Sequence, residues 1–165
     1  MPQESRTNLN TLKEIYKEIE VEIDQSNKKG ESTIILGDFN CKVGNYIKNN
    51  KEEVTKGGKL LLNMIKKYNL DIVNRLECCE GLWTRKEGKF KSVIDYILVS
   101  KNELDHIEKM VIDEDRDITP YYINTEENNA RIYTDHFMIS ATFNLNLSCL
   151  KKPRHCFALQ TDKFQ

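Results

Sequence analysis

Apolar residues recur at spacings of three and four in two segments of the chain, and this periodicity predicts two amphipathic helices. The first covers residues 8–25, with leucine and isoleucine on one face and lysine and glutamate on the other. The second follows Gly57 and Gly58, and Asn69 closes it, because asparagine tolerates the left-handed conformation that ends many helices. We therefore expect two helices that each bury one face.

Strand patterns follow both helices and fill much of the second half of the chain. Short apolar runs at 32–36 and 70–74 predict buried strands. Residues 82–84 form a further short run, and residues 93–99 are apolar except for one aspartate. Apolar residues alternate with mostly polar ones over 137–146, the clearest period of two in the chain, which predicts a strand with one buried face.

The other segments lack such periodicity and are predicted to be loops. Residues 41–55 are polar and typical of a surface loop, and residues 87–89 favour a hairpin-like turn. A charged, loop-like region with a short apolar piece at 110–112 leads to the last strand. The pattern therefore predicts one domain over residues 1–147, and a tail or the start of a linker over 148–165.

Length and composition agree with one globular domain. The chain has 165 residues, of which 39% are hydrophobic and 31% are charged. No stretch approaches the ~20 apolar residues of a membrane span, and the N-terminal residues lack the apolar core of a signal peptide. We therefore expect an intracellular protein without a membrane partner.

The cysteines and the net charge narrow the chemistry further. The five cysteines lack the spacing of metal ligands and are expected to be reduced thiols. The net charge is -1, whereas a nucleic-acid-binding module usually carries a basic excess. Any attraction for phosphate must therefore come from local lysines and a bound cation.

Asp95 is the most informative single position, because it interrupts an otherwise apolar strand. An unpaired carboxylate in such a strand would be strongly destabilising, so Asp95 needs a partner or faces a polar cleft. Two roles stay open: a core aspartate bonded to backbone amides or a turn, and a carboxylate that orients a histidine.

His136 is the histidine that best suits this second role. It follows Asp135 directly at the start of the alternating strand, which places two polar side chains at the edge of the sheet. His106 lies in a charged segment and His155 in the predicted tail, so both are expected to be surface residues. The aspartate–histidine pair, with Asp95 available elsewhere, favours a functional site.

Asp38 and Asn40 follow the first apolar strand and Gly37, which permits an unusual backbone angle or a close approach. Alternation along the strand predicts that both side chains extend to one side, with Phe39 on the other. A carboxylate and an amide so placed suit contact with a hard cation or a phosphate. The alternative is an Asx turn that caps the strand.

Three motifs in this order resemble the endonuclease/exonuclease/phosphatase family, which includes DNase I and the apurinic-site endonucleases. The similarity is greatest to the endonuclease domain of non-LTR retrotransposons and to craniofacial development protein 2-like sequences, and it covers about residues 2–145. It implies an α/β fold, the C-terminal portion of the DNase I-like four-layer αββα sandwich with mixed, mostly antiparallel sheets. The motifs are Gly37-Asp38-Phe39-Asn40, the strand around Asp95, and Thr134-Asp135-His136.

The resemblance also implies a role for each site residue. Asp38 corresponds to the family's base or water-orienting carboxylate, and Asn40 to the amide that positions the phosphate and the metal. Asp95 corresponds to the carboxylate that keeps His136 protonated and directed at the scissile phosphate. Asp135 corresponds to the metal-contacting aspartate. The expected metal is Mg²⁺, with Mn²⁺ as a substitute, held by Asp135, Asp38 and Asn40.

The implied activity is Mg²⁺-dependent hydrolysis of phosphodiester bonds in DNA, as in target-site nicking by a retroelement. In a full-length element a reverse transcriptase region would adjoin this domain, and the location would by analogy be nuclear. Two features differ from the family: Thr134 stands where serine is usual, and the half that supplies a metal-holding asparagine and glutamate has no counterpart in the sequence. We therefore expect activity to be weak or lost.

Two other functions stay open. One is hydrolysis of a phosphoester that is not a nucleic acid, such as a phosphoinositide or a sphingolipid, although no amphipathic membrane-binding stretch favours it. The other is an inactive remnant that serves as a binding or structural module.

Overall fold

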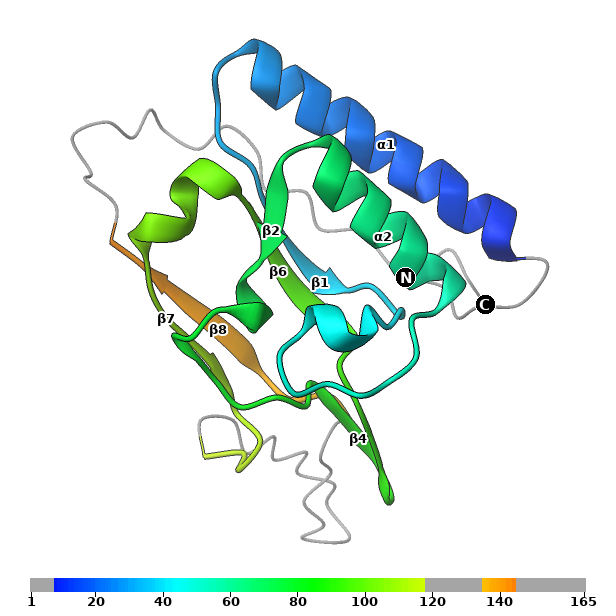
Figure 1. Cartoon of the computed structure of the whole chain (residues 1–165), viewed down its shortest axis with the longest axis vertical. Helices are drawn as coiled ribbons and strands as arrows, with labels where there is room; N and C mark the ends of the chain where they lie inside the picture. Colours follow the sequence, from blue (N-terminus) through cyan, green and yellow to red (C-terminus); the bar gives the residue numbers. More distant parts are fainter. Residues whose placement is uncertain (1–7, 118–134, 145–165) are drawn as a thin grey trace, which may run out of the picture.

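The computed structural model describes residues 8–117 and 135–144 and arranges them in three layers (Figure 1). Helices α1 (Asn8–Lys28) and α2 (Lys56–Lys67) lie side by side in the first layer. The second layer is a sheet with the strand order β1-β6-β2, and the third is a sheet with the order β3-β7-β8. Their strands are β1 (Ile34–Asp38), β2 (Leu70–Ile72), β3 (Cys79–Glu80), β6 (Asp95–Ser100), β7 (Ile107–Ile112) and β8 (Ile139–Phe143).

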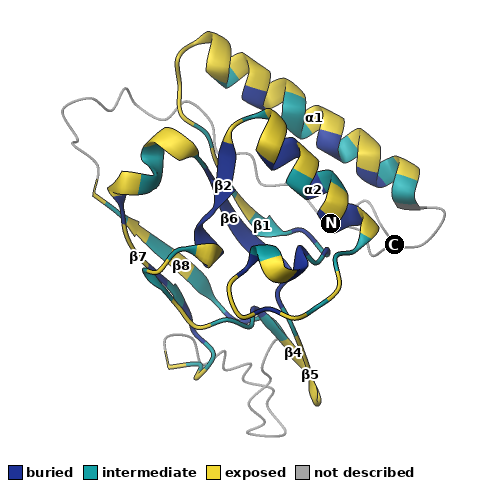
Figure 2. Ribbon diagram, viewed as in Figure 1, coloured by how far each residue is buried: buried dark blue, intermediate teal, exposed yellow. Residues whose placement is uncertain are grey.

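Strand β6 contacts both neighbouring layers, because successive side chains of a strand point to opposite faces. Tyr96 and Leu98 belong to the apolar cluster beneath the two helices. Ile97 and Val99 belong to the cluster shared with the third layer. Strands β2 and β6 accordingly appear buried along their length in Figure 2. Burial on both faces explains why residues 96–99 of β6 are all apolar.

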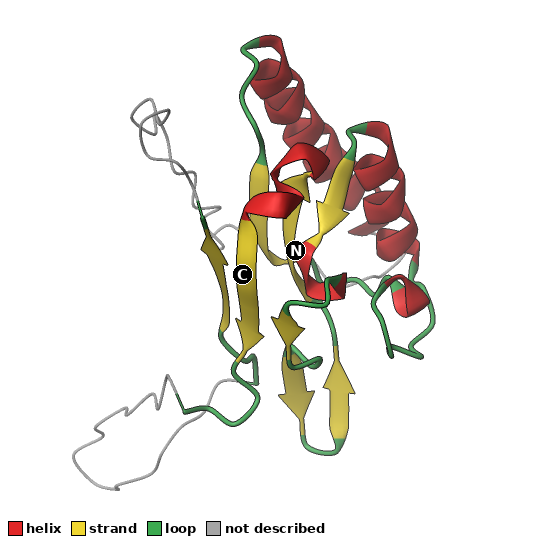
Figure 3. Cartoon of the chain, turned by 60° about the vertical axis from the view of Figure 1, so that its left-hand side comes forward, coloured by secondary structure: helices red, strands yellow, loops and turns green. Residues whose placement is uncertain are grey.

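Strands β4 (Arg85–Glu87) and β5 (Phe90–Ser92) form a hairpin that projects beyond the two sheets (Figure 3). Its turn lies at Gly88, where φ is 57°, as the sequence predicted for 87–89. Phe90 is 81% exposed on this hairpin. Three short 3₁₀ helices complete the described elements, at Gly44–Tyr46, Val73–Arg75 and Lys101–His106.

Most of the predicted elements are confirmed. Both amphipathic helices form, and Asn69 takes the left-handed conformation expected after the second, with a φ of 52°. The last strand, predicted over 137–146, spans Ile139–Phe143, and its apolar face is half-buried while its polar face is exposed. Only the β3–β7 pairing is parallel among the described strands, so the sheets are mixed and mostly antiparallel. No helix in the described ranges is long and apolar enough to cross a membrane. The predicted tail at 148–165 lies outside the described residues.

Residues 41–55 are not the surface loop that their polar composition predicted. Cys41, Val43 and Ile47 are at most 1% exposed and belong to the cluster beneath the helices. The segment packs tightly on helix α2, since a Cβ atom added to Gly58 would lie 1.9 Å from the carbonyl oxygen of Lys42. Three apolar residues at irregular spacing give no periodic signal, so the sequence did not reveal this burial.

Other predicted strands differ from the structure in extent. Residues 82–84 precede β4 and form no strand, and the strand predicted at 70–74 gives way to a 3₁₀ turn after Ile72. The region around 110–112, predicted to be loop-like, is the six-residue strand β7. A register irregularity in its pairing with β8 interrupts the alternation of buried side chains, which removes the period of two.

Candidate active site

Strands β1 and β6 each place one carboxylate at the same end of the central sheet. The strands are antiparallel, and their register sets Asp38, the last residue of β1, opposite Asp95, the first residue of β6. Gly37 has a φ of 150°, which confirms the unusual backbone angle expected there. The backbone N–H of Phe39 donates to the carbonyl of Ile94 at 2.9 Å and continues the pairing past the strand end.

His136 contacts Asp95 directly. Its Nδ1 atom lies 3.0 Å from Oδ1 and 3.1 Å from Oδ2 of Asp95. Burial raises the pKa of the Asp95 carboxyl, while a hydrogen bond from Thr84 and the charge of His136 act in the opposite direction. A carboxylate at Nδ1 makes that nitrogen the donor and so fixes the tautomer and orientation of the ring. Of the two roles considered for Asp95, this contact fits the one in which the carboxylate orients a histidine.

Two further carboxylates flank the other ring nitrogen. Nε2 of His136 lies 4.0 Å from Oδ2 of Asp38 and 4.0 Å from Oδ1 of Asp135. Asp135 also accepts a hydrogen bond from Nε of Arg85 at 2.6 Å, which holds the pKa of its carboxyl below the usual range. The structure thus brings together four of the five predicted site residues around one imidazole. Thr134, which precedes Asp135, lies outside the described residues.

Asn40, the fifth residue, lies next to Asp38 in a conformation that alternation did not predict. Strand β1 ends at Asp38, and Asn40 has a φ of 47°, in the left-handed region. Its backbone N–H donates to Oδ1 of Asp38 at 2.8 Å, which is the geometry of an Asx turn. The expectation that both side chains extend from one side of a continuous strand is therefore wrong, because the strand ends between them.

The donor atoms of this site fit a divalent cation. Asp38, Asp95 and His136 each offer one ligand atom, and these three atoms lie within 4.8 Å of one another. Proteins usually hold Mg²⁺ by one or two carboxylates together with water and substrate oxygens. Within this group Asp95 is engaged with Nδ1 of His136, and Asp135, the other carboxylate near that ring, is not one of the three. The roles of Asp38, Asp135 and Asn40 as metal ligands stay predictions.

A comparison with protein families gives a match along most of the chain. The family model described as endonuclease-reverse transcriptase matches residues 2–140. The chain belongs to this family. The match includes the end of β1 and the segment that carries His136, so it confirms the resemblance inferred from the three motifs. A comparison with curated proteins found no match.

A solved structure supports the fold of this endonuclease-reverse transcriptase family member. The structure is similar to the endonuclease domain of TRAS1, a telomere-specific non-LTR retrotransposon, with a TM-score of 0.57 and 18% sequence identity. The similarity covers 82% of this chain and 52% of that chain, so the chain spans about half the length of the TRAS1 domain. The predicted DNase I-like α/β fold is therefore confirmed.

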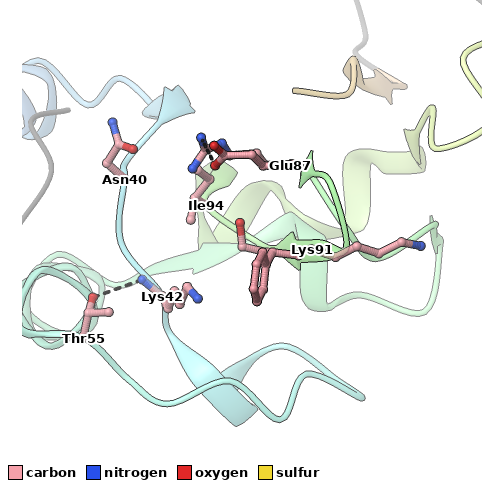
Figure 4. A pocket seen from close by; sticks show the side chains of 9 residues that line it. Asn40, Lys42, Thr55, Glu87, Lys91 and Ile94 are labelled. Atoms are coloured by element: carbon pink, nitrogen blue, oxygen red, sulfur yellow. Dashed lines mark hydrogen bonds and ion pairs between the residues drawn. The ribbon is translucent and has the colours of Figure 1, made fainter. Parts of the chain in front are cut away.

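A depression beside the site of this endonuclease-family chain is lined by three cationic side chains and by Glu87. The depression has a volume of about 360 Å³, and Figure 4 shows Asn40 and Lys42 on one side and Lys91 on the other. Arg85 also lines it and joins it to the site through Asp135. The net charge of -1 leaves any attraction for phosphate to local cations. Each cation here pairs with a carboxylate: Lys42 with Glu52, Lys91 with Glu114, and Arg85 with Asp135 and Glu87.

Two buried polar residues that sequence reasoning missed hold Asp95 within the endonuclease-family fold. Oγ1 of Thr84 accepts hydrogen bonds from the backbone N–H groups of Ile94 and Asp95, each at 3.0 Å. Asn74 donates to the carbonyl of Asp95 at 3.1 Å and accepts from the N–H of Ile97 at 3.1 Å. Each bonds to backbone at least ten residues away in the chain, so spacing alone could not identify either.

Proposed function

We propose that this chain carries the active site of a metal-dependent endonuclease of the retrotransposon type, which hydrolyses phosphodiester bonds in DNA. The observation that supports this most is the contact between His136 and Asp95, with Asp38 and Asp135 on the other side of the imidazole. Membership of the endonuclease-reverse transcriptase family supports a nucleic-acid substrate.

In this proposal, His136 acts as the proton donor and Asp38 as the proton acceptor. Asp95 stabilises the protonated ring of His136, so that Nε2–H donates to an oxygen of the scissile phosphate. Asp38 orients the attacking water and accepts its proton. The side-chain amide of Asn40 donates to a phosphate oxygen. Positioned acid–base groups of this kind typically contribute roughly 10²–10⁴-fold each to a rate.

Asp38, Asp135 and Asn40 would hold the cation, for which we propose Mg²⁺ with Mn²⁺ as a substitute. When bound, Mg²⁺ would polarise a phosphoryl oxygen and neutralise its developing charge. Arg85 donates to Oδ2 of Asp135 at 2.6 Å and lowers the pKa of that carboxyl, whereas Oδ1 lies on the side of Nε2 of His136. In this proposal Oδ1 of Asp135 would contact the cation while Oδ2 stays bonded to Arg85.

The positive side chains around the depression would attract the DNA backbone. Lys42, Arg85 and Lys91 line it, and phosphates would bind them in exchange for their carboxylate partners. Cations of this kind supply most sequence-independent affinity for DNA. The net charge of the chain is only -1, so this attraction is local and not a property of the whole surface. We further propose that a reverse transcriptase region adjoins the domain in a full-length element, and that the protein acts in the nucleus.

The substrate class can be tested by offering the full chain several phosphodiesters under the same conditions. The substrates are supercoiled plasmid DNA, a phosphoinositide and sphingomyelin, each in Mg²⁺, in Mn²⁺ and in EDTA. We expect slow conversion of supercoiled plasmid to nicked circles with either metal, no conversion in EDTA, and no hydrolysis of the two lipids. Metal-dependent hydrolysis of a lipid without plasmid nicking would contradict the proposal.

One observation favours a second candidate, a module that binds DNA without cleaving it. The chain spans about half the length of the TRAS1 endonuclease domain, so a family member of full length has elements that this chain does not match. Binding of a fluorescent DNA duplex with no nicking at any Mg²⁺ concentration would support this candidate. Nicking that depends on Mg²⁺ would exclude it.

A further inference from the structure

Residues Leu82, Trp83 and Thr84, the 82–84 segment, connect the two parts of the site, and Glu114 holds this segment in place. We propose that Glu114 is a positioning residue, which sets the geometry of the Asp95–His136 pair through the 82–84 segment. The inference rests on the proposed function for its effect on catalysis, whereas its structural part can be measured independently.

The first link of this chain of contacts joins the 82–84 segment to Asp95. Thr84 is fully buried, and its Oγ1 atom accepts hydrogen bonds from the backbone N–H groups of Ile94 and Asp95. Its own N–H donates to the carbonyl of Ser92 at 3.0 Å. A shift of Thr84 would therefore move the start of β6, where the carboxylate is attached.

The second link joins the same segment to His136. The carbonyl of Thr84 accepts a hydrogen bond from the N–H of Phe137 at 2.8 Å. Two residues further on, the N–H of Lys86 donates to the carbonyl of Asp135 at 2.7 Å. These bonds fix the backbone on both sides of His136, so Thr84 sits between the carboxylate and the imidazole that must meet.

Glu114 anchors the beginning of the 82–84 segment. One oxygen of its carboxylate, Oε1, accepts from the N–H of Leu82 at 2.7 Å and from the N–H of Trp83 at 3.1 Å. The other, Oε2, lies 3.4 Å from Nζ of Lys91 on the hairpin. The side chain is 25% exposed and therefore partly shielded from water. Since residues 82–84 belong to no strand, a side chain takes the place of a sheet partner.

The structural part of the proposal can be tested by NMR, because Trp83 is the only tryptophan in the sequence. Selective ¹⁵N-tryptophan labelling gives a single backbone amide signal, from the N–H that donates to Glu114. In Glu114→Ala we expect this signal to move upfield and its exchange with solvent to accelerate by about 10-fold or more. Glu114→Gln, which keeps a weaker acceptor, should give an intermediate signal.

If Glu114 is a positioning residue, its substitution should also change the chemical shifts of the His136 ring. The ring ¹⁵N and ¹H signals of His136, assigned with His136→Ala, should shift in Glu114→Ala and shift less in Glu114→Gln. The matched control is Asp115→Asn, which removes one negative charge at the exposed neighbouring residue. It should leave both signals at their positions in the parent chain.

In the nicking assay, Glu114→Ala should lower kcat by about 10-fold or more at unchanged KM for DNA, because misplacement of catalytic groups acts on the chemical step. Glu114→Gln should keep most of the parent kcat, and the control Asp115→Asn should keep the full parent kcat. If the parent chain does not nick DNA, the proposed function fails, and the two NMR signals still decide the inference.

A Trp83 signal that moves while the His136 signals stay in place would overturn the proposal, because Glu114 would then support only the local backbone. The same conclusion would follow if Asp115→Asn moved the His136 signals as far as Glu114→Ala does. Should Glu114→Ala fail to fold, as judged by circular dichroism, the comparison of Glu114→Gln with Asp115→Asn gives the same test.

Discussion

Two opposing effects act on the pKa of the Asp95 side chain. It is 8% exposed, and burial raises its pKa, although His136 and Thr84 both favour the charged form. A charged carboxylate that is buried lowers the stability of the fold, but it can stabilise the protonated form of a neighbouring histidine. The balance at this residue therefore connects the stability of the chain with its proposed chemistry.

We expect Asp95→Asn to lose activity without losing stability. The raised pKa means that the folded chain binds the proton more tightly than the unfolded chain, so the stability contributed by Asp95 falls as pH rises above about 4. Asparagine at position 95 cannot ionise, so it removes this loss of stability with rising pH. It also carries no negative charge to stabilise the protonated ring of His136. Nicking should drop by roughly 10²–10⁴-fold, while urea unfolding at pH 7 should show a free energy equal to or above that of the parent.

Asp105→Asn, at an exposed position, is the matched control and should change neither quantity. A loss of more than about 1 kcal/mol in Asp95→Asn, the size of a typical net hydrogen bond, would contradict this view of the site.

The Arg85–Asp135 pair predicts a pH dependence of the opposite sign. Its hydrogen bond lowers the pKa of Asp135, so the pair contributes stability above the ordinary pKa of about 4 and loses it as pH falls through the lowered value. The side chain of Asp135 is 44% exposed, so we expect only a few tenths of a kcal/mol. Urea unfolding of Arg85→Gln and the parent from pH 7 to pH 2 should show a difference that shrinks below pH 4.

Lys86→Gln, which removes a charge from the exposed neighbouring residue, is the control and should follow the parent at every pH. Arg85 also pairs with Glu87 at 2.8 Å, so Arg85→Gln removes both ion pairs. A difference between Arg85→Gln and the parent that persists at pH 2 would mean that packing, and not the ion pairs, carries the effect.

Sequence reasoning found the site residues that bear unusual chemistry and missed those that bond to backbone. Asp95 stood out because a carboxylate interrupts an apolar strand, and His136 because it follows Asp135 at a strand start. Thr84 and Asn74 are ordinary residue types whose importance depends on which N–H and carbonyl groups the fold brings to them. Partners of that kind are set by tertiary structure, so a single sequence carries no signal for them.

At the scale of elements, periodicity predicted what is regular and failed where burial is irregular. Both helices and the alternating strand β8 have a repeating apolar face. The segment 41–55 instead buries three scattered apolar residues against helix α2. The end of β1 illustrates the same limit, because alternation was extended to Asn40 across a strand end that lies at Asp38.

The contact between Gly58 and Lys42 predicts a severe effect of one methyl group. A Cβ atom at Gly58 would lie 1.9 Å from the carbonyl oxygen of Lys42, so helix α2 must move away from the 41–55 segment. We expect Gly58→Ala to lower the free energy of unfolding by about 1–3 kcal/mol or more, the range for overpacking. Thermal and urea unfolding measure this directly.

Lys59→Ala is the control, since Lys59 is exposed in the same helix and alanine is a good helix former. Gly58→Ala at parent stability would show that helix α2 and the 41–55 segment are not in close contact.

Strand β3 makes a prediction about thiol chemistry. Burial raises the pKa of Cys79 to about 11, with further contributions from Cys78 and Glu80. The thiolate is the reactive form, so at pH 8 iodoacetamide should label Cys79 about 100-fold more slowly in the folded chain than in urea. Mass spectrometry of the peptide that holds both cysteines separates them, and equal rates with and without urea would contradict the partial burial of Cys79.

At the scale of the whole molecule, the site lies where separate parts of the fold meet. The central sheet supplies Asp38 and Asp95, and the segment that leads into β8 supplies Asp135 and His136. An isolated antiparallel backbone bridge between Arg85 and His136 links the base of the hairpin to the segment that precedes β8. The fold could be expected from the family resemblance that the three motifs carry, whereas the joining contacts became visible only in three dimensions.

The rate of plasmid nicking by His136→Ala, measured beside the parent in Mg²⁺, tests the central claim most directly. His106→Ala is the matched control, because His106 is exposed and pairs with Glu103 away from the site. We predict slow nicking by the parent and by His106→Ala, and a rate lower by roughly 10²–10⁴-fold in His136→Ala. Nicking by His136→Ala at the parent rate, or no nicking by the parent, would contradict the assignment of this site.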